Sequence, residues 1–167
     1  NNMPSVAVHH VELHKKTNDL VMGTHGRGVI IIDDISPLRE INKDILDKEL
    51  HFFSSEPFIM KDGSGGFGNG FGAETQFVGA NGPSGALIKC LLPKRHIFGK
   101  MTMEIQDMEG NKITTISPGK NKGINIVNWS YTIRNPKVAN GKTFSFGGFT
   151  APRVPAGQYK AVITKGK

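Results

Sequence analysis

The chain has 167 residues and a formal net charge of +7, and 37% of its residues are hydrophobic. This length accommodates one ordinary domain with an appendage, and the hydrophobic content excludes a wholly disordered chain. The Lys and Arg residues are scattered without a tract of five or more, so nucleic acid is not an expected partner. No apolar run approaches the ~18 residues of a membrane span.

The first predicted elements are three short antiparallel strands at residues 7–14, 19–24 and 29–33. Polar residues separate the first two strands, and the glycine-punctuated turn 25–28 separates the second from the third. The third strand is apolar on both faces, which is typical of a strand covered on both sides. Because three short strands bury too little to be stable alone, we expect them to pack on something or to belong to a larger sheet.

A helix or broken helix is predicted over residues 36–50, connecting two regions of the chain. Ser36 is the expected N-cap, and Pro37 suits the first helical position. Apolar residues recur behind them at helical spacing, at Leu38, Ile41, Ile45 and Leu46.

The remainder of the chain has an all-β pattern of about seven short strands, which predicts a two-sheet sandwich. The glycine-rich segment 62–72 is expected to be a connector, and Trp129, with Ile124, Ile126 and Val127 nearby, is expected to fill the core between the sheets. The predicted strands are 52–53, 58–60, 86–92, 100–106, 112–116, 123–131 and 158–164.

Two segments resemble known families. The run Asn18 to Asp34, which reads NDLVMGTHGRGVIIIDD, continues into Ile35-Ser36-Pro37-Leu38. It resembles the closing blade of the sortilin-like, BNR-repeat β-propeller proteins that are often labelled glycosyl hydrolases. The order of segments 107–111, 123–129 and 154–159 resembles the Ig-like domain of the flagellar hook-cap type.

The resemblances imply an all-β fold class: an Ig-like β-sandwich preceded by a three-stranded remnant of a β-propeller blade and a short helical linker. The implied divisions are the blade strands at 1–35, the linker at 36–50 and the sandwich at 51–167.

The candidate site residues are His25, Arg27, Asp33 and Asp34. In a functional interpretation, the turn at a propeller rim places the Arg27 guanidinium on a carboxylate or a sugar acid. In the structural interpretation, which we favour, the turn glycines Gly26 and Gly28 adopt positive φ, Arg27 pairs with Asp33 or Asp34, and Thr24 or His25 hydrogen-bonds the turn. The two aspartates are neighbours on one strand and diverge, so they do not form the converging carboxyl pair of a glycosidase.

No catalytic residue, cofactor or metal is expected. His10 and His14 are ~13 Å apart on a strand, too far to share one ion, and His9 points to the opposite face from His10. Cys90 lies in an apolar strand without a neighbour that would lower its pKa.

The function implied by the resemblance is that of a non-catalytic accessory module of a larger secreted, periplasmic or cell-surface propeller protein. The implied partner is the remainder of that propeller. When the propeller is missing, the N-terminal strands are expected either to fold back on the sandwich or to pair with the same strands of a second copy, and we favour the pairing. Two alternatives are a carbohydrate- or protein-binding sandwich, and a piece of a glycoside hydrolase whose catalytic residues lie elsewhere. Exposed aromatic side chains that form a flat platform would favour sugar binding, whereas burial of Trp129, Tyr131, Tyr159 and the Phe residues would favour a structural role.

Overall fold

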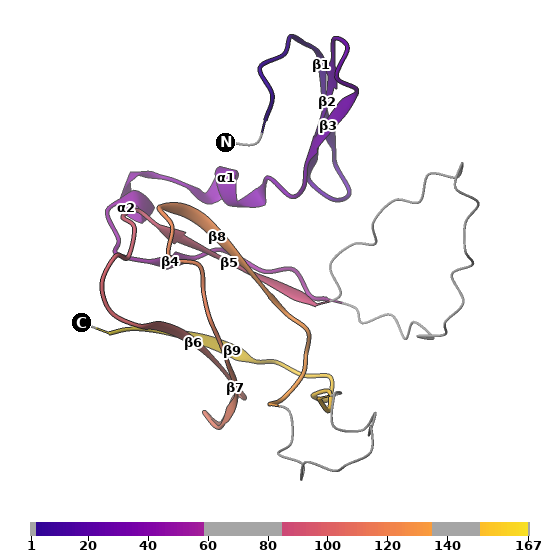
Figure 1. Ribbon diagram of the computed structural model, residues 1–167. Coiled ribbons are helices and arrows are strands. Elements are labelled where there is room, and N and C mark those ends of the chain that lie inside the picture. The colour runs from indigo at the N-terminus through magenta and orange to yellow at the C-terminus, as the bar shows by residue number, and fades with distance from the viewer. Residues whose placement is uncertain (1–2, 59–84, 135–150, 167) are drawn as a thin grey trace, which may run out of the picture. The chain divides into compact units, whose positions relative to one another are not determined.

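A computed structural model describes residues 3–58, 85–134 and 151–166. The fold is all-β with a short helical segment, as predicted (Figure 1). The chain divides into two compact units, Asn1–Lys48 and Glu49–Lys167, so the helical segment falls within the first unit. The predicted glycine-rich connector lies outside the described residues.

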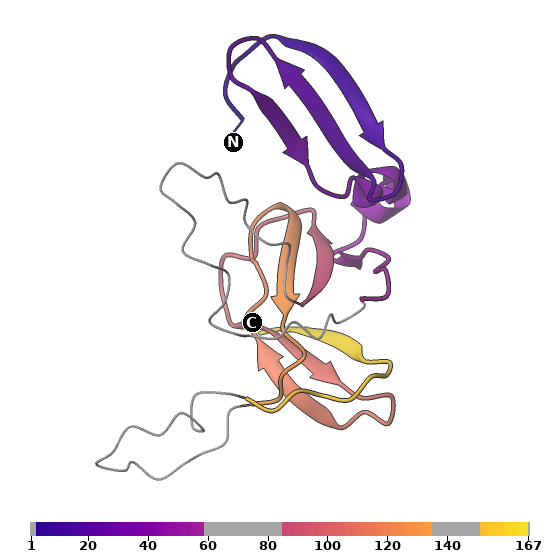
Figure 2. The same ribbon diagram turned by 90° about the vertical axis from the view of Figure 1, so that its right-hand side faces the viewer.

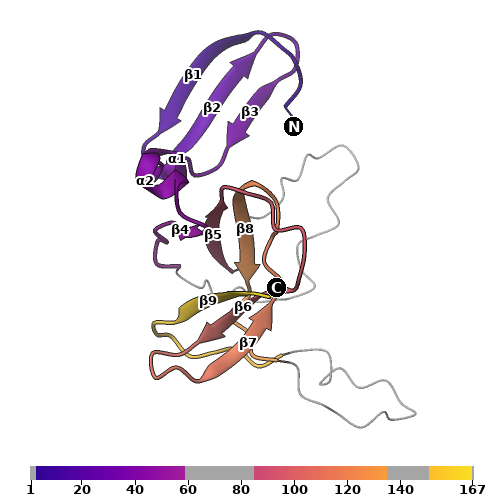
Figure 3. The same cartoon turned by 90° about the vertical axis from the view of Figure 1, so that its left-hand side faces the viewer.

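Unit 1 contains the predicted three-stranded antiparallel meander, in the order β1-β2-β3 (Figure 3). Its strands are β1 (Val8–His14), β2 (Asp19–Thr24) and β3 (Val29–Ile32). Residues that pair across an antiparallel sheet share a face, as do alternate residues along a strand. The register therefore defines an aliphatic face, made of Val11, Leu13, Leu20, Met22, Ile30 and Ile32.

Much of the apolar surface of this meander is open to solvent. Met22 is buried, but Val11 and Ile32 on the aliphatic face are 54% and 42% exposed. On the opposite face Val29 and Ile31 are 64% and 56% exposed. The cover that we expected on both faces of the third strand is therefore absent from the described part of the chain.

The predicted broken helix is confirmed as two short helices, α1 (Ser36–Glu40) and α2 (Lys43–Leu46). The prediction that Ser36 is the N-cap is wrong, because Ser36 is already helical and Ile35 occupies the cap without a side-chain bond. Instead, the Ser36 N–H donates to the Asp34 carboxylate at 3.1 Å. α2 has an ordinary cap, in which the Asn42 Oδ1 accepts from the Ile45 N–H at 2.9 Å.

Unit 2 contains two three-stranded antiparallel sheets, β4-β5-β8 and β7-β6-β9 (Figure 2). The structure places the predicted strand 123–131 only up to Trp129, because Tyr131 adopts a positive φ of 59° that ends the extended run. Phe58, from the predicted strand 58–60, lies outside any strand. The strands of unit 2 are β4 (His51–Phe52), β5 (Ala86–Leu92), β6 (Met101–Gln106), β7 (Lys112–Ile116), β8 (Gly123–Trp129) and β9 (Lys160–Lys165).

Both sheets of unit 2 contribute to one core around Trp129, which is buried as predicted. The cluster consists of Met103, Ile105, Val127, Trp129 and Val154. The indole Nε1–H of Trp129 donates to the Thr132 carbonyl at 3.2 Å.

The neighbours of Trp129 on β8 alternate between the two faces of the strand. Ile124 and Ile126 are exposed, so the expectation that they share the core with Trp129 is wrong. The inward positions of β8 are instead held by Asn125, Val127 and Trp129.

Candidate functional site

The turn between β2 and β3 is held by hydrogen bonds at its base. Gly26 and Gly28 adopt φ of 75° and 74°, a region that favours glycine. The Thr24 N–H and hydroxyl both donate to the Gly28 carbonyl, at 3.1 and 2.6 Å, and the His25 N–H donates to the carbonyl of Ala7 at 3.0 Å. These bonds leave the Arg27 side chain exposed at the tip.

The structure does not bring Arg27 together with the two candidate aspartates. Arg27 precedes β3 and Asp33 follows it, and the four strand residues between them alone span about 13 Å at ~3.3 Å per residue. Among the described residues Arg27 forms no ion pair with either aspartate. The ion pair expected in the structural interpretation is therefore not formed, although the glycine geometry and the bonds of Thr24 and His25 support that interpretation.

Asp34 belongs instead to a polar cluster at the other end of the sheet. Its N–H donates to the Asp19 Oδ1 at 2.9 Å, across 15 residues of sequence. The other oxygen of Asp19 accepts from the Thr17 hydroxyl, which also contacts the His14 Nδ1 at 2.6 Å. These hydrogen bonds hold the pKa of Asp19 below its ordinary value, Thr17 contributing most.

This cluster resembles a catalytic triad in composition but not in chemistry. A nucleophilic hydroxyl must give its proton to the histidine, and the carboxylate must hold the histidine. Here the Thr17 hydroxyl donates its proton to Asp19 and not to His14, so the carboxylate binds the hydroxyl instead of holding the histidine. The cluster ties the β1–β2 turn to the end of β3.

Two histidines that the sequence analysis did not pair lie together at the turn end of the sheet. The rings of His9 and His25 have centroids 5.3 Å apart with an interplanar angle of 39°. A structural zinc site takes four ligands. Within residues 3–58, 85–134 and 151–166, no group of three or more His, Cys, Asp or Glu side chains is arranged to hold a metal.

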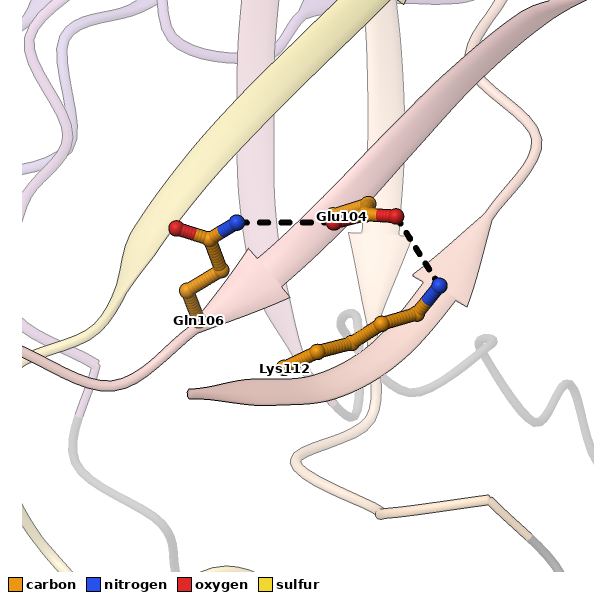
Figure 4. Close-up of polar contacts among 3 residues, drawn as sticks. All are labelled: Glu104, Gln106 and Lys112. Atoms are coloured by element: carbon orange, nitrogen blue, oxygen red, sulfur yellow. Dashed lines mark hydrogen bonds and ion pairs between the residues drawn. The ribbon is translucent and has the colours of Figure 1, made fainter. Parts of the chain in front are cut away.

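The carboxylates of unit 2 are also engaged in local bonds. Glu104 on β6 accepts from the Lys112 Nζ at 2.9 Å and from the Gln106 Nε2 at 3.4 Å (Figure 4). The bond from Lys112 is the main reason that the pKa of Glu104 is lowered. The Asp107 carboxylate accepts from the side chain and the N–H of Asn111, at 2.9 and 2.7 Å, which lowers its pKa in the same way.

These lowered pKa values bear on glycoside hydrolysis, in which one carboxylic acid must hold its proton and give it to the leaving group. Such an acid needs a raised pKa. The pKa values of Asp19, Glu104 and Asp107 are all lowered. All three remain ionised at neutral pH and can accept hydrogen bonds but not act as general acids.

A depression of about 470 Å³ lies along β7. Among the described residues, those that line it are Lys112, Ile113, Thr114, Thr115 and Arg134. These described lining residues include no carboxylate, thiol or imidazole, so they offer cations and strand backbone but no general acid or nucleophilic thiol.

Comparison of the chain with known proteins identifies no relative. No family model matches the chain, and neither a curated protein nor a solved structure does. The described residues contain no helix that is both long and apolar enough to cross a membrane.

Proposed function

We propose that the chain is a non-catalytic structural module of a larger secreted or cell-surface protein of the β-propeller class. In this proposal β1–β3 form part of a propeller blade, and unit 2 is an Ig-like sandwich that follows it. The glycosyl-hydrolase label of such proteins then describes the larger protein, whose chemistry would draw on residues outside this chain.

The observation that carries the proposal is the open apolar surface of the meander in unit 1. A propeller blade is a small antiparallel sheet, covered by the next blade on each face. The meander has aliphatic side chains on both faces, and Val11, Val29, Ile31 and Ile32 are among those left exposed. Covering four such side chains stabilises a protein by roughly 1.5–3 kcal/mol each, so this surface is suited to a neighbouring layer.

Trp129, Tyr131 and Tyr159 of unit 2 support a structural role over a sugar-binding one, although Phe58 and Phe98 are 41% and 81% exposed. Sugar-binding faces present exposed rings, whereas Trp129 is buried. Tyr131 and Tyr159 are partly buried and pack on it, with ring centroids at 5.1 and 5.2 Å. The Tyr159 hydroxyl donates to the Pro155 carbonyl at 2.6 Å, so it serves the turn before β9.

Hydrogen exchange tests the proposed packing. The amides of β1–β3 are compared in this chain and in the full product of the gene that encodes it, with β5 and β8 as an internal reference. We expect β1–β3 to gain at least tenfold in protection in the full product while the reference changes little. Equal protection of β1–β3 in the two proteins would overturn the proposed packing.

A second experiment tests the absence of catalysis. The purified chain is incubated with a panel of aryl glycosides, beside the variants Glu104→Gln and Asp107→Asn. We expect no turnover above the buffer rate for any of the three proteins. Turnover by the chain that either substitution abolishes would show that unit 2 is itself an enzyme.

A further inference from the structure

The loop between β5 and β6, residues 93–100, exposes two large apolar side chains side by side. Ile97 is 69% exposed and Phe98 is 81% exposed, the two highest values among the exposed large hydrophobic residues of the described chain. Single exposed apolar residues are ordinary on protein surfaces, whereas contiguous exposed apolar surface is typical of interaction sites.

Exposed cations lie in this loop and in the neighbouring loop before β8. Lys94, Arg95 and Lys100 belong to the same loop and are exposed, and Lys122 lies on the neighbouring loop before β8. None of the four forms an ion pair with a described acidic side chain. Their charges are therefore available to an external anion.

The charge of the whole chain is concentrated in the same unit. Unit 2 has 15 Lys and Arg against seven Asp and Glu, whereas unit 1 has six against seven. Unit 2 thus carries +8 and unit 1 carries −1. No acidic residue occurs between Gln76 and Met103 or after Glu109, so both loops lie in acid-free segments of sequence.

Hydrogen bonds connect the loop 93–100 to the loop before β8, so the two loops hold each other in place. The His96 N–H donates to the Lys120 carbonyl at 3.0 Å, and the Lys120 Nζ donates to the Gly99 carbonyl at 2.8 Å. Asn125 fixes the second loop from inside, because its side chain donates to the Asn121 carbonyl at 2.8 Å and accepts from the Asn121 N–H at 3.2 Å.

We propose that the loop 93–100 docks unit 2 onto an anionic lipid bilayer, with Ile97 and Phe98 entering the interface and the cations of the two loops binding lipid phosphates. Exposed apolar side chains with Lys and Arg in the same loop suit a bilayer surface, where the acyl boundary lies beneath charged headgroups. Each cation near such a surface contributes to binding and loses its effect at high salt. The site is in unit 2 and does not depend on the packing proposed for unit 1.

The apolar pair distinguishes a bilayer from other anionic partners. A nucleic acid could stack a base on Phe98, but it offers Ile97 no apolar layer to enter. An acidic protein surface would satisfy the cations alone. A bilayer accommodates both parts of the loop, and this is why we assign it.

Co-flotation with vesicles tests the assignment. The full chain is mixed with vesicles of phosphatidylcholine alone or of phosphatidylcholine with phosphatidylglycerol. We expect binding to the anionic vesicles only. The variants Ile97→Ser/Phe98→Ser and Lys94→Glu/Arg95→Glu should each weaken binding by on the order of tenfold or more.

Matched controls distinguish binding through this loop from nonspecific adsorption of the chain to vesicles. Val29→Thr/Ile31→Thr removes two exposed aliphatic side chains of unit 1, and Lys15→Glu/Lys16→Glu makes the same change of charge on the exposed turn after β1. Both controls should retain vesicle binding within about twofold of the parent chain. Loss of binding in the controls equal to that in the loop variants would overturn the assignment.

A depth measurement distinguishes insertion from surface attraction. In the variant Phe98→Trp, lipids brominated on their acyl chains should quench the new indole, while the parent chain, whose one Trp is buried, should show little quenching. Absence of quenching would overturn the proposal. Full vesicle binding by Ile97→Ser/Phe98→Ser, together with equal competition by DNA, would also overturn the proposal. That result would identify the loop as a site for anionic polymers.

Discussion

The carboxylate of Asp19, at the start of β2, accepts a hydrogen bond from the backbone N–H of Asp34, just beyond β3, at 2.9 Å. This bond joins two points that are 15 residues apart in the chain. Asp34 has a positive φ of 42°, which is uncommon for a residue other than glycine. The Asp19 carboxylate therefore stabilises the point where the meander ends and α1 begins.

We predict that unit 1 loses stability in acid through Asp19. Its folded-state pKa is lowered, so its stabilising contribution is complete above the ordinary value of 3.8 and is lost as the pH falls through the lower folded value. Asp19→Asn should lower the stability of unit 1 at neutral pH and flatten its dependence on pH in this acid range. Hydrogen exchange of the β1–β3 amides measures the effect, and an unchanged acid dependence in Asp19→Asn would contradict it.

Trp129→Ala should destabilise unit 2 by about 3–5 kcal/mol, because it removes the largest side chain of the core. It also removes the ring contacts with Tyr131 and Tyr159. The matched control is Ile126→Ala on the same strand, where the side chain is 59% exposed and the expected cost is below about 1 kcal/mol. Denaturant melts followed by circular dichroism provide the comparison, and equal costs would show that β8 is placed with the wrong face inward.

Gly85→Ala should destabilise unit 2 by about 1–3 kcal/mol through overpacking. A Cβ atom at Gly85 would lie 2.2 Å from the Trp129 carbonyl oxygen, a backbone atom that cannot turn aside. At Gly157 the same atom would meet only ordinary contacts with Tyr159, the nearest at 3.8 Å. Gly157→Ala should therefore be neutral within about 0.5 kcal/mol. Denaturant melts of both variants, followed by Trp129 fluorescence, measure the two changes in stability. A neutral Gly85→Ala would contradict the close approach of Gly85 to the backbone of Trp129.

The isolated chain should associate with itself through unit 1. The edges of β1 and β3 are unpaired in the described chain, and such edges beside exposed aliphatic side chains favour pairing between copies. Val29→Thr/Ile31→Thr keeps strand-forming residues but removes apolar area, so it should raise the dissociation constant by about tenfold. Ile126→Thr in unit 2 is the control and should leave it unchanged.

Sedimentation velocity over a range of micromolar concentrations measures this association. A parent chain that remains monomeric throughout would rule out the dimer. Association that persists unchanged in Val29→Thr/Ile31→Thr would place the contact elsewhere.

Patterns within single segments were predictable from the sequence. Strands form at 8–14, 19–24, 86–92 and 112–116, where alternating apolar residues and turn glycines predicted them. Both signals depend only on residues close together in the sequence. The inward position of Asn125 was not predictable, because an amide can be buried only after the loop at Asn121 has folded back to bind it.

The polar contacts of unit 1 were harder to predict than its strands. The link between Asp19 and Asp34, and the ring contact of His9 with His25, depend on the register of the meander. A shift of one residue would separate either pair. The basic character of the loop at Ile97 could have been found earlier, since the absence of acidic residues from Gln76 to Met103 is visible in the sequence.

The burial of Trp129 in unit 2 has a practical consequence for how this molecule is observed. The chain has one Trp, two Tyr and one Cys, and all four residues lie in unit 2, with Cys90 fully buried. Burial also raises the pKa of the Cys90 thiol, so thiol reagents report the opening of β5. Unit 1 contains none of these probes, so an experiment that uses only Trp or Tyr fluorescence and thiol labelling would record the unfolding of unit 2 and would miss that of unit 1.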